Sequence, residues 1–359
     1  MRRQMLAGAL GAAVVAAGGC HDGAGPAPTG PGLAGAPSLA VATMEGTRIG
    51  SASGSEGAAV KLSATAPASA SSFRWSAPAG CTLSGQSRTG ASLSCADNGS
   101  FEVSLALGDA GGASVTTRQS IVIKNAAPAA GEIKMPELVR AGSSFAASLP
   151  FTDKGKLDTH TATWAFNSSY VHATKPGTVS ESNGSGTASL QYAFPRGGFY
   201  DVKATVADKD GGKGVAEKWN VIAYDPNAGT LQAVGSVFTP AGSYANDPGG
   251  AIVDFGLEIG YPSPSAQAPA GRLAFGLPGG GVFRATSFRY LVVEGDHVYA
   301  EGNGTIDGRN GYSFYLHAVS GGDFAPEVRF KIEDRHYNYV FDNDGGTALE
   351  EGGRVRVVR

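Results

Sequence analysis

Residues 197–212 read GGFYDVKATVADKDGG and decide the expected fold. Aromatic and β-branched residues fill the first part of this stretch, and its Asp-x-Asp-Gly-Gly end is rich in turn residues. Residues 99–112, GSFEVSLALGDAGG, have the same order of features, and an aromatic segment precedes each copy, at 73–75 and at 163–166. Two copies in one order predict an internal repeat of a β-sandwich module.

Apolar residues alternate with polar residues between positions 41 and 124, which predicts antiparallel strands with one buried face each. Turn signals at 97–99 and 109–112 separate these strands. The residues expected to face inward are Val60, Leu62, Ala64, Phe73, Trp75, Leu93, Phe101, Val103, Leu105, Leu107, Ile121 and Ile123.

The composition fits several small β domains. The 359 residues include 54 Gly and 19 Pro, which argues against a helical protein, while 42% hydrophobic residues are enough to bury cores. A domain holds roughly 150 residues, so we expect two or three domains. The net charge is −3, whereas nucleic-acid-binding proteins usually carry an excess of basic residues. We therefore expect no nucleic-acid partner.

Residues 125–224 resemble the PKD domain, a β-sandwich of bacterial surface and secreted proteins. The matching segments are 151–153 (FTD), 164–166 (WAF), 197–202 (GGFYDV), 206–208 (VAD) and 210–212 (DGG). Residues 41–124 are similar to a more divergent member of the same family. The resemblance implies tandem immunoglobulin-like sandwiches that act as spacer or adhesion modules.

Residues 225–359 resemble a C-terminal β domain of uncharacterised activity that follows PKD units in some bacterial extracellular proteins. The matching segments are 224–226, 239–244, 254–256, 291–293, 302–308, 329–332 and 340–343. The resemblance implies a sandwich or barrel and no known chemistry. The expected fold is therefore all-β, with tandem PKD-type sandwiches, a C-terminal β-sandwich or barrel domain and an N-terminal signal helix.

The first 20 residues predict export. Two arginines precede an apolar run at 5–17 that is too short to span a bilayer, so residues 1–19 are expected to be a signal peptide. The end of the run, Ala-Gly-Gly before Cys20, resembles a bacterial lipoprotein signal, which implies lipidation of Cys20. Residues 20–40 then form a flexible linker. We expect a lipid-anchored protein of the outer membrane or cell surface, or a secreted one if Cys20 carries no lipid.

The other two cysteines, Cys81 and Cys95, are expected to form a disulfide in an oxidising compartment. The bond closes a loop of 15 residues, worth roughly 3 kcal/mol in the chain-entropy treatment.

Calcium is the cofactor that the PKD resemblance implies. The matching positions are Asn125, Asp153, Asp208 and Asp210, whose oxygens are the hard ligands that calcium prefers. The alternative is that the Asp-x-Asp-Gly-Gly segment only makes a turn, with Asp capping the backbone.

Aromatic residues concentrate after position 225, where 17 of the 28 Phe and Tyr residues lie. Strand alternation assigns many of them to a core. The alternative is a stacking platform for sugars or a protein interface, formed by Tyr337 and Tyr339 and by Tyr261.

No catalytic motif stands out, because the six His residues are scattered and no Gly-x-Ser-x-Gly segment is present. We expect a non-enzymatic envelope protein whose sandwiches present a C-terminal domain that binds polysaccharide or a surface protein. Two alternatives remain open, namely a component of extracellular polysaccharide hydrolysis and a calcium-stiffened structural spacer.

Overall fold

The computed structural model describes residues 48–50, 52–245, 249–321, 325–344 and 347–359. The expected signal peptide, Cys20 and the linker lie outside the described residues. The all-β expectation is confirmed: apart from a three-residue 3-10 helix, η1 (Pro278–Gly280), the described residues form strands, turns and loops. None of the helical structure in this part of the chain is long and apolar enough to cross a membrane.

The N-terminal sandwich (48–124) has two four-stranded sheets. One has the order β1-β3-β6-β5 and the other β2-β8-β7-β4. Its strands are β1 (Arg48–Ile49), β2 (Ser53–Ser55), β3 (Val60–Thr65), β4 (Ala70–Ser76), β5 (Cys81–Ser87), β6 (Gly90–Cys95), β7 (Gly99–Asp109) and β8 (Ser114–Lys124). Trp75, Leu93 and Leu105 are buried between the sheets, as the two-residue alternation predicts. Phe73 was also expected to face inward, but it is 45% exposed.

The middle sandwich (129–224) is one eight-stranded sheet folded on itself, in the order β10-β16-β15-β12-β13-β14-β11-β9. Its strands are β9 (Ala129–Ala130), β10 (Leu138–Arg140), β11 (Phe145–Thr152), β12 (His160–Asn167), β13 (His172–Ser182), β14 (Ser185–Tyr192), β15 (Gly198–Asp208) and β16 (Lys213–Tyr224). Trp164, Phe166 and Tyr200 are fully buried at its centre.

The two sandwiches share one strand plan. In each, a short strand lies parallel to the last long strand, β2 along β8 and β10 along β16. The last strand pairs with its hairpin partner, β7 or β15, which pairs with the strand that carries the buried Trp, β4 or β12. They differ at β13, which pairs with both β12 and β14 and so joins the two halves of the middle sandwich.

The C-terminal domain (230–358) is a nine-stranded sheet that curls around one core, in the order β24-β23-β22-β21-β20-β19-β18-β17-β25. Tyr244, just after β17, bridges to Phe341 in β24, so the two ends of the sheet meet. The strands are β17 (Thr230–Thr239), β18 (Ala251–Gly260), β19 (Ala270–Gly276), β20 (Val282–Glu294), β21 (His297–Ile306), β22 (Arg309–Val319), β23 (Glu327–Asp334), β24 (Tyr339–Asp342) and β25 (Arg354–Val358).

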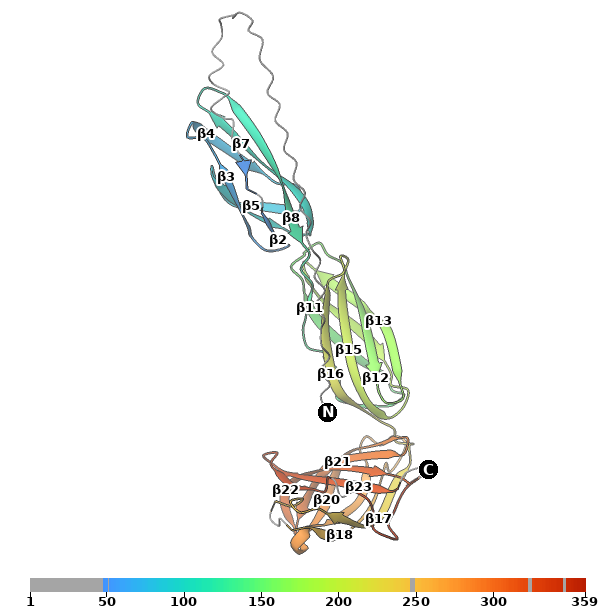
Figure 1. Cartoon of the computed structure of the whole chain (residues 1–359). Coiled ribbons are helices and arrows are strands. Elements are labelled where there is room, and N and C mark those ends of the chain that lie inside the picture. Colours follow the sequence, from blue (N-terminus) through green and yellow to red (C-terminus); the bar gives the residue numbers. More distant parts are fainter. Residues whose placement is uncertain (1–47, 51, 246–248, 322–324, 345–346) are drawn as a thin grey trace, which may run out of the picture.

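The three units follow one another along an elongated molecule (Figure 1). The chain therefore has two junctions, the first between the N-terminal and middle sandwiches and the second between the middle sandwich and the C-terminal domain. These two junctions hold the candidate sites.

Candidate metal centre

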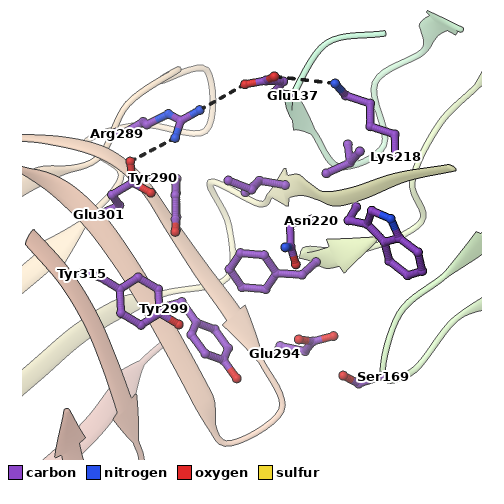
Figure 2. A pocket seen from close by; sticks show the side chains of 14 residues that line it. Glu137, Ser169, Lys218, Asn220, Arg289, Tyr290, Glu294, Tyr299, Glu301 and Tyr315 are labelled. Carbon is purple, nitrogen blue, oxygen red and sulfur yellow. Dashed lines mark hydrogen bonds and ion pairs between the residues drawn. The ribbon is translucent and has the colours of Figure 1, made fainter. Parts of the chain in front are cut away.

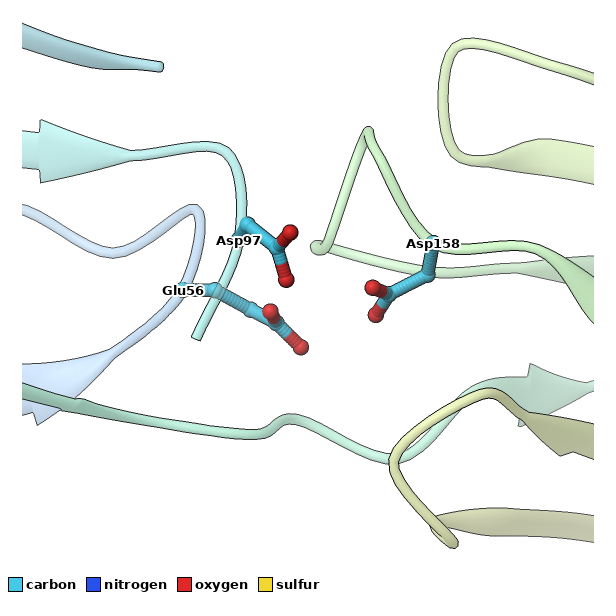
Figure 3. A group of neighbouring side chains, drawn as sticks. All are labelled: Glu56, Asp97 and Asp158. Carbon is cyan, nitrogen blue, oxygen red and sulfur yellow. The ribbon is translucent and has the colours of Figure 1, made fainter. Parts of the chain in front are cut away.

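Carboxylates from two different units meet at the first junction. Glu56 lies in the turn after β2, Asp97 in the turn between β6 and β7, and Asp158 in the loop between β11 and β12. One oxygen of each lies within 4.8 Å of the others. Figure 3 shows the Glu56 and Asp97 side chains on one side of the junction and Asp158 on the other. Neither sandwich could form this group alone.

A second group shares Asp158. Oxygens of Asp153, Asp158 and Asp208 also lie within 4.8 Å of one another. With Asp210, whose Oδ2 lies 3.0 Å from Lys209 Nζ in the same turn, these residues form the acid cluster, defined as Glu56, Asp97, Asp153, Asp158, Asp208 and Asp210.

The four positions that the sequence suggested for calcium lie in or beside this cluster. Asn125 donates through Nδ2 to Asp208 Oδ2 over 3.0 Å. The other oxygen of Asp208 accepts from the backbone N–H groups of Asp210 and Gly212. Asp153 accepts from Gly155 N–H and faces His160. The capping expected of an Asp-x-Asp-Gly-Gly turn is therefore present, and the turn also places Asp208 against the rest of the cluster.

Three buried oxygens of this region have no hydrogen-bond partner among the described residues: Glu56 Oε2, Asp158 Oδ2 and Asn125 Oδ1. Glu56 is 0% exposed and the Asp158 side chain is equally buried. A buried acceptor without a partner costs about 1–3 kcal/mol, and more when it is charged. These oxygens therefore favour a bound cation or ordered water.

Two side chains of the chain itself supply positive charge. Lys209 Nζ lies 2.8 Å from Asp97 Oδ1 and also contacts Asp158 Oδ1, so it links the two units. His160 lies between Asp153 Oδ2, at 3.0 Å, and Glu181 Oε2, at 2.5 Å. Counting Glu181, seven carboxylates face two cationic groups, and negative charge remains in excess.

The pKa values reflect this excess. Burial, aided by the charges of Asp158, Asp153 and Asp97, raises the pKa of Glu56 to about 7. Burial also raises the pKa of Asp158, against the opposing effect of Lys209. For His160 burial acts to lower the pKa, but the hydrogen bonds to Asp153 and Glu181 outweigh it and the pKa is raised. Near neutral pH the cluster therefore holds protons that a divalent cation could displace.

Glycines allow the carboxylates to come this close. A Cβ on Gly155 would lie 2.2 Å from Asp158 Oδ2 and 2.7 Å from Glu56 Cδ. A Cβ on Gly212 would lie 2.3 Å from Asp208 Oδ2. Larger residues at either position would push acidic side chains out of the junction.

The disulfide expected between Cys81 and Cys95 is confirmed. The two residues face each other directly on β5 and β6. The backbone beside the bond contacts the neighbouring parts of the junction, since Cys95 O accepts from Gly57 N–H and Ala96 O accepts from Leu157 N–H of the middle sandwich. The bond thus restricts the position of the segment that carries Asp97.

The three tyrosines suggested as a ligand platform have different surroundings. Tyr261 stacks on Tyr224 at 5.4 Å between centroids, and its hydroxyl bonds the backbone of Leu291, so it joins units rather than facing a ligand. The hydroxyl of Tyr339 donates to Gly242 O over 2.9 Å and holds a loop. Tyr337 is 83% exposed.

Sequence reasoning missed three members of the acid cluster. Asp97 stands out in the sequence only as part of a turn signal, Asp158 only as a neighbour of His160, and Glu56 not at all. The place of each residue in the cluster depends on how the two sandwiches are oriented relative to each other. Local sequence patterns do not indicate that orientation. The available signal was the order of the repeats, because the linker at Asn125 joins the end of β8 directly to the middle sandwich and so brings turns of one unit to loops of the next.

No model of a known protein family matches the sequence, and a comparison with curated proteins gives no match. Among solved structures, the Yersinia pseudotuberculosis adhesin InvE is similar over 60% of this chain and 66% of its own, at 11% identity and a TM-score of 0.29. An ICAM-5 D1-D4 ectodomain fragment is similar over 87% and 98%, at 10% identity and a TM-score of 0.27. The fibronectin(III)-like modules of Clostridium thermocellum CbhA are similar over 48% and 93%, at 12% identity and a TM-score of 0.20. Likenesses of this strength carry no information on ligand or activity.

Proposed function

We propose that this chain is a non-enzymatic spacer of the bacterial cell envelope, anchored through a lipid on Cys20. Its two PKD-like sandwiches are locked end to end by a divalent cation, calcium, and hold the C-terminal domain away from the membrane as a recognition domain for polysaccharide or a surface protein. The observation that carries the proposal is the acid cluster, in which buried oxygens without partners come from both sides of the first junction.

The donor set fits calcium. Calcium takes six to eight oxygen ligands and tolerates irregular loops. Carboxylates of Glu56, Asp158 and Asp208 and the amide oxygen of Asn125 are hard donors already desolvated at the junction. A cation held by Glu56 on one unit and by Asp158 on the other would cancel their repulsion and resist bending between the sandwiches.

Such a lock suits a spacer. Two sandwiches joined by a short linker bend relative to each other unless their interface is large or bonded. In the sequence the expected anchor precedes the N-terminal sandwich. In the described chain that sandwich and the C-terminal domain lie at opposite ends (Figure 1). Stiffness at the first junction therefore extends the reach of the last domain.

Calorimetric titration of the metal-free chain with calcium tests the proposal. We expect saturable binding and a rise in the melting temperature, since a ligand that binds only the folded state stabilises it. Glu56→Gln and Asp158→Asn should each weaken binding at least tenfold. The matched control is Glu102→Gln, which removes an exposed carboxylate of the same sandwich that pairs with Arg118.

Unchanged calcium binding in both cluster variants would overturn the proposed lock. The absence of any calcium binding by the wild-type chain would do the same.

A further inference from the structure

A groove runs from the second junction across the outer face of the C-terminal domain. It begins as a cavity of about 690 Å³ between the two units (Figure 2). A cavity of about 620 Å³ adjoins it and shares Glu301 and Tyr315 with it. A third, of about 390 Å³, shares Asn303, Ser313 and Tyr337 with the second. We call these three cavities the junction groove.

Strand register orders the floor of the groove. Glu301 in β21 lies opposite Tyr290 in β20 and Tyr315 in β22, and Tyr315 lies opposite Lys331 in β23. The next row, two residues along β21, β22 and β23, is Asn303, Ser313 and Glu333. Residues facing each other on one side of a sheet are about 5 Å apart. The floor is thus a regular array of hydroxyl, amide and charged groups that includes aromatic rings.

Two exposed aromatic rings line the groove. Trp219, which lines the first cavity, is 63% exposed, and Tyr337, which lines both the second and the third, is 83% exposed. Aromatic rings that remain in water along one groove are typical of binding sites.

The backbone has a positive φ at or beside each of these rings. Asn220, beside Trp219, has a φ of 58° at a β-bulge opposite the 200–202 segment of β15. Tyr337 has a φ of 60°, which is costly for a bulky side chain. Its turn is held by Asp334, which accepts from the N–H groups of His336 and Asn338. Such strain persists only where surrounding contacts impose it, and it is often found at ligand sites.

The charges of the groove cancel. Its two larger cavities are lined by four acidic residues, Glu137, Glu294, Glu301 and Glu333, and by four basic residues, Lys218, Arg289, Arg329 and Lys331. Arg289 lies 3.0 Å from Glu301 and 3.7 Å from Glu137, and Lys331 lies 2.6 Å from Glu333. A strongly charged polymer would have to break these pairs, whereas a neutral molecule rich in hydroxyls can bond to them as they stand.

The second junction is rigid enough to hold a ligand. Ile222 of the middle sandwich packs with Tyr290 and Val292 of the C-terminal domain in one buried cluster. Phe199 lies edge-on to Tyr299, with ring centroids 5.0 Å apart. The two walls of the first cavity are therefore fixed relative to each other.

We propose that the junction groove binds an uncharged polysaccharide chain, whose sugar rings stack on Trp219 and Tyr337 and whose hydroxyls bond to the paired polar side chains of the floor. Sugar rings have one apolar face and a polar rim, which match the exposed aromatic rings and the polar floor of the groove. A protein partner would need an apolar patch at the centre of its site, where the groove instead has Glu301, Lys331 and Asn303. The inference deepens the proposed function and rests on its assignment of recognition to the C-terminal domain.

Glu137 and Glu301 are both held by Arg289, at 3.7 Å and 3.0 Å. The ion pairs hold these carboxylates in place as acceptors for hydroxyl groups. An assay for new reducing ends distinguishes binding from cleavage.

Tryptophan fluorescence of the full chain reports on ligand binding in the groove. Trp219 is exposed there, whereas Trp75 and Trp164 are buried in the sandwich cores. The probes are four uncharged polymers (laminarin, xyloglucan, arabinoxylan and galactomannan) and two charged ones, polygalacturonate and chitosan. We expect a saturable change in emission with at least one uncharged polymer. Trp219→Phe should remove the signal yet keep binding in affinity electrophoresis.

Variants test whether the rings bind the ligand. Trp219→Ala and Tyr337→Ala should each weaken affinity about tenfold, while Tyr337→Phe should stay within about twofold of wild type. Phe238→Ala, which removes an exposed aromatic side chain of β17 outside the groove, is the matched control and should bind like wild type.

Failure of the wild-type chain to bind any of the uncharged polymers would overturn the proposal, as would preferential binding of a charged polymer or release of new reducing ends. Calcium binding at the first junction is measured separately by calorimetry, so failure of the groove and failure of the cation lock give different results.

Discussion

The two junctions of this chain join their units by opposite means. The first brings together carboxylates of two sandwiches, with Lys209 as the direct ionic link between them. The second buries an apolar cluster that includes Ile222, Tyr290 and Val292. The first junction is therefore held mainly by charge, and the second by packing together with the ion pair of Glu137 and Arg289.

This difference has consequences for stability. An apolar contact is insensitive to calcium and nearly insensitive to pH, whereas a cluster of buried carboxylates depends on both. We therefore expect the first joint to respond to calcium and the second joint not to respond to it. The rigid joint is also the one that carries the groove, where two walls from different units must stay in place.

The largest effect should come from breaking the second junction. Tyr290→Ala removes a ring that is 2% exposed, and loss of a buried aromatic side chain costs about 3–5 kcal/mol. We expect a lower melting transition of the C-terminal domain in scanning calorimetry of the full chain. Tyr290→Phe keeps the ring and should cost about 1 kcal/mol. Equal losses in the two variants would contradict the packing account.

At the first junction, stability should depend on pH when calcium is absent. The pKa of Glu56 is about 7 in the folded chain against an ordinary 4.5, so the folded state binds more protons between these values. Stability should therefore fall as pH rises from about 5 to 7, by up to about 3 kcal/mol. The raised pKa of His160 acts in the same direction, since its stabilising charge is lost as pH rises.

Calcium should flatten this dependence, because a bound cation keeps Glu56 ionised. Melting temperatures between pH 5 and 8, with chelator and with calcium, measure the effect, and Glu56→Gln should reduce the slope in chelator. A slope that is unchanged in Glu56→Gln would show that other groups cause it.

The disulfide should support the first junction as well as its own sandwich. Replacing both residues, Cys81→Ser with Cys95→Ser, opens a loop of 15 residues, which should cost about 3 kcal/mol. Because Asp97 follows Cys95 closely, calcium affinity should fall too. Thermal unfolding and calorimetric titration of the double variant measure both effects, and wild-type calcium affinity in a folded double variant would separate the disulfide from the acid cluster.

Substitution of Lys209 should have the smallest effect on stability, and this effect should depend on calcium. Lys209→Gln removes the internal cation, whose side chain is 35% exposed, so without calcium we expect a loss of only about 1 kcal/mol. With calcium the loss should shrink, because the metal replaces the missing charge. Melting temperatures in chelator and in calcium measure the two losses, and a larger loss with calcium present would mean that Lys209 helps to form the metal site.

The fold could be predicted from the sequence because its signals are local. Alternation around Leu105 and the repeated turn at Asp109 and Asp208 depend only on neighbours along the chain. Pairing of β13 with both β12 and β14 could not be predicted, since it depends on how the sheet edges meet.

The candidate sites were predicted only where one unit supplies the residues. Asn125, Asp153, Asp208 and Asp210 lie within one sandwich and its linker, so a family resemblance could point to them. Glu56 comes from the neighbouring unit and has no signal of its own. The sequence gives no signal for Trp219 either. Only its exposure beside a bulge distinguishes it from a core residue.

Distance distributions across the two junctions test the central claim most directly. Spin labels on Glu102→Cys and Lys175→Cys span the first junction, and labels on Lys175→Cys and Arg309→Cys span the second, in a chain that also carries Cys20→Ser. All three labelled positions are exposed. We predict that calcium narrows the first distribution and leaves the second unchanged. A first distribution that is equally narrow in chelator and in calcium would contradict the cation lock.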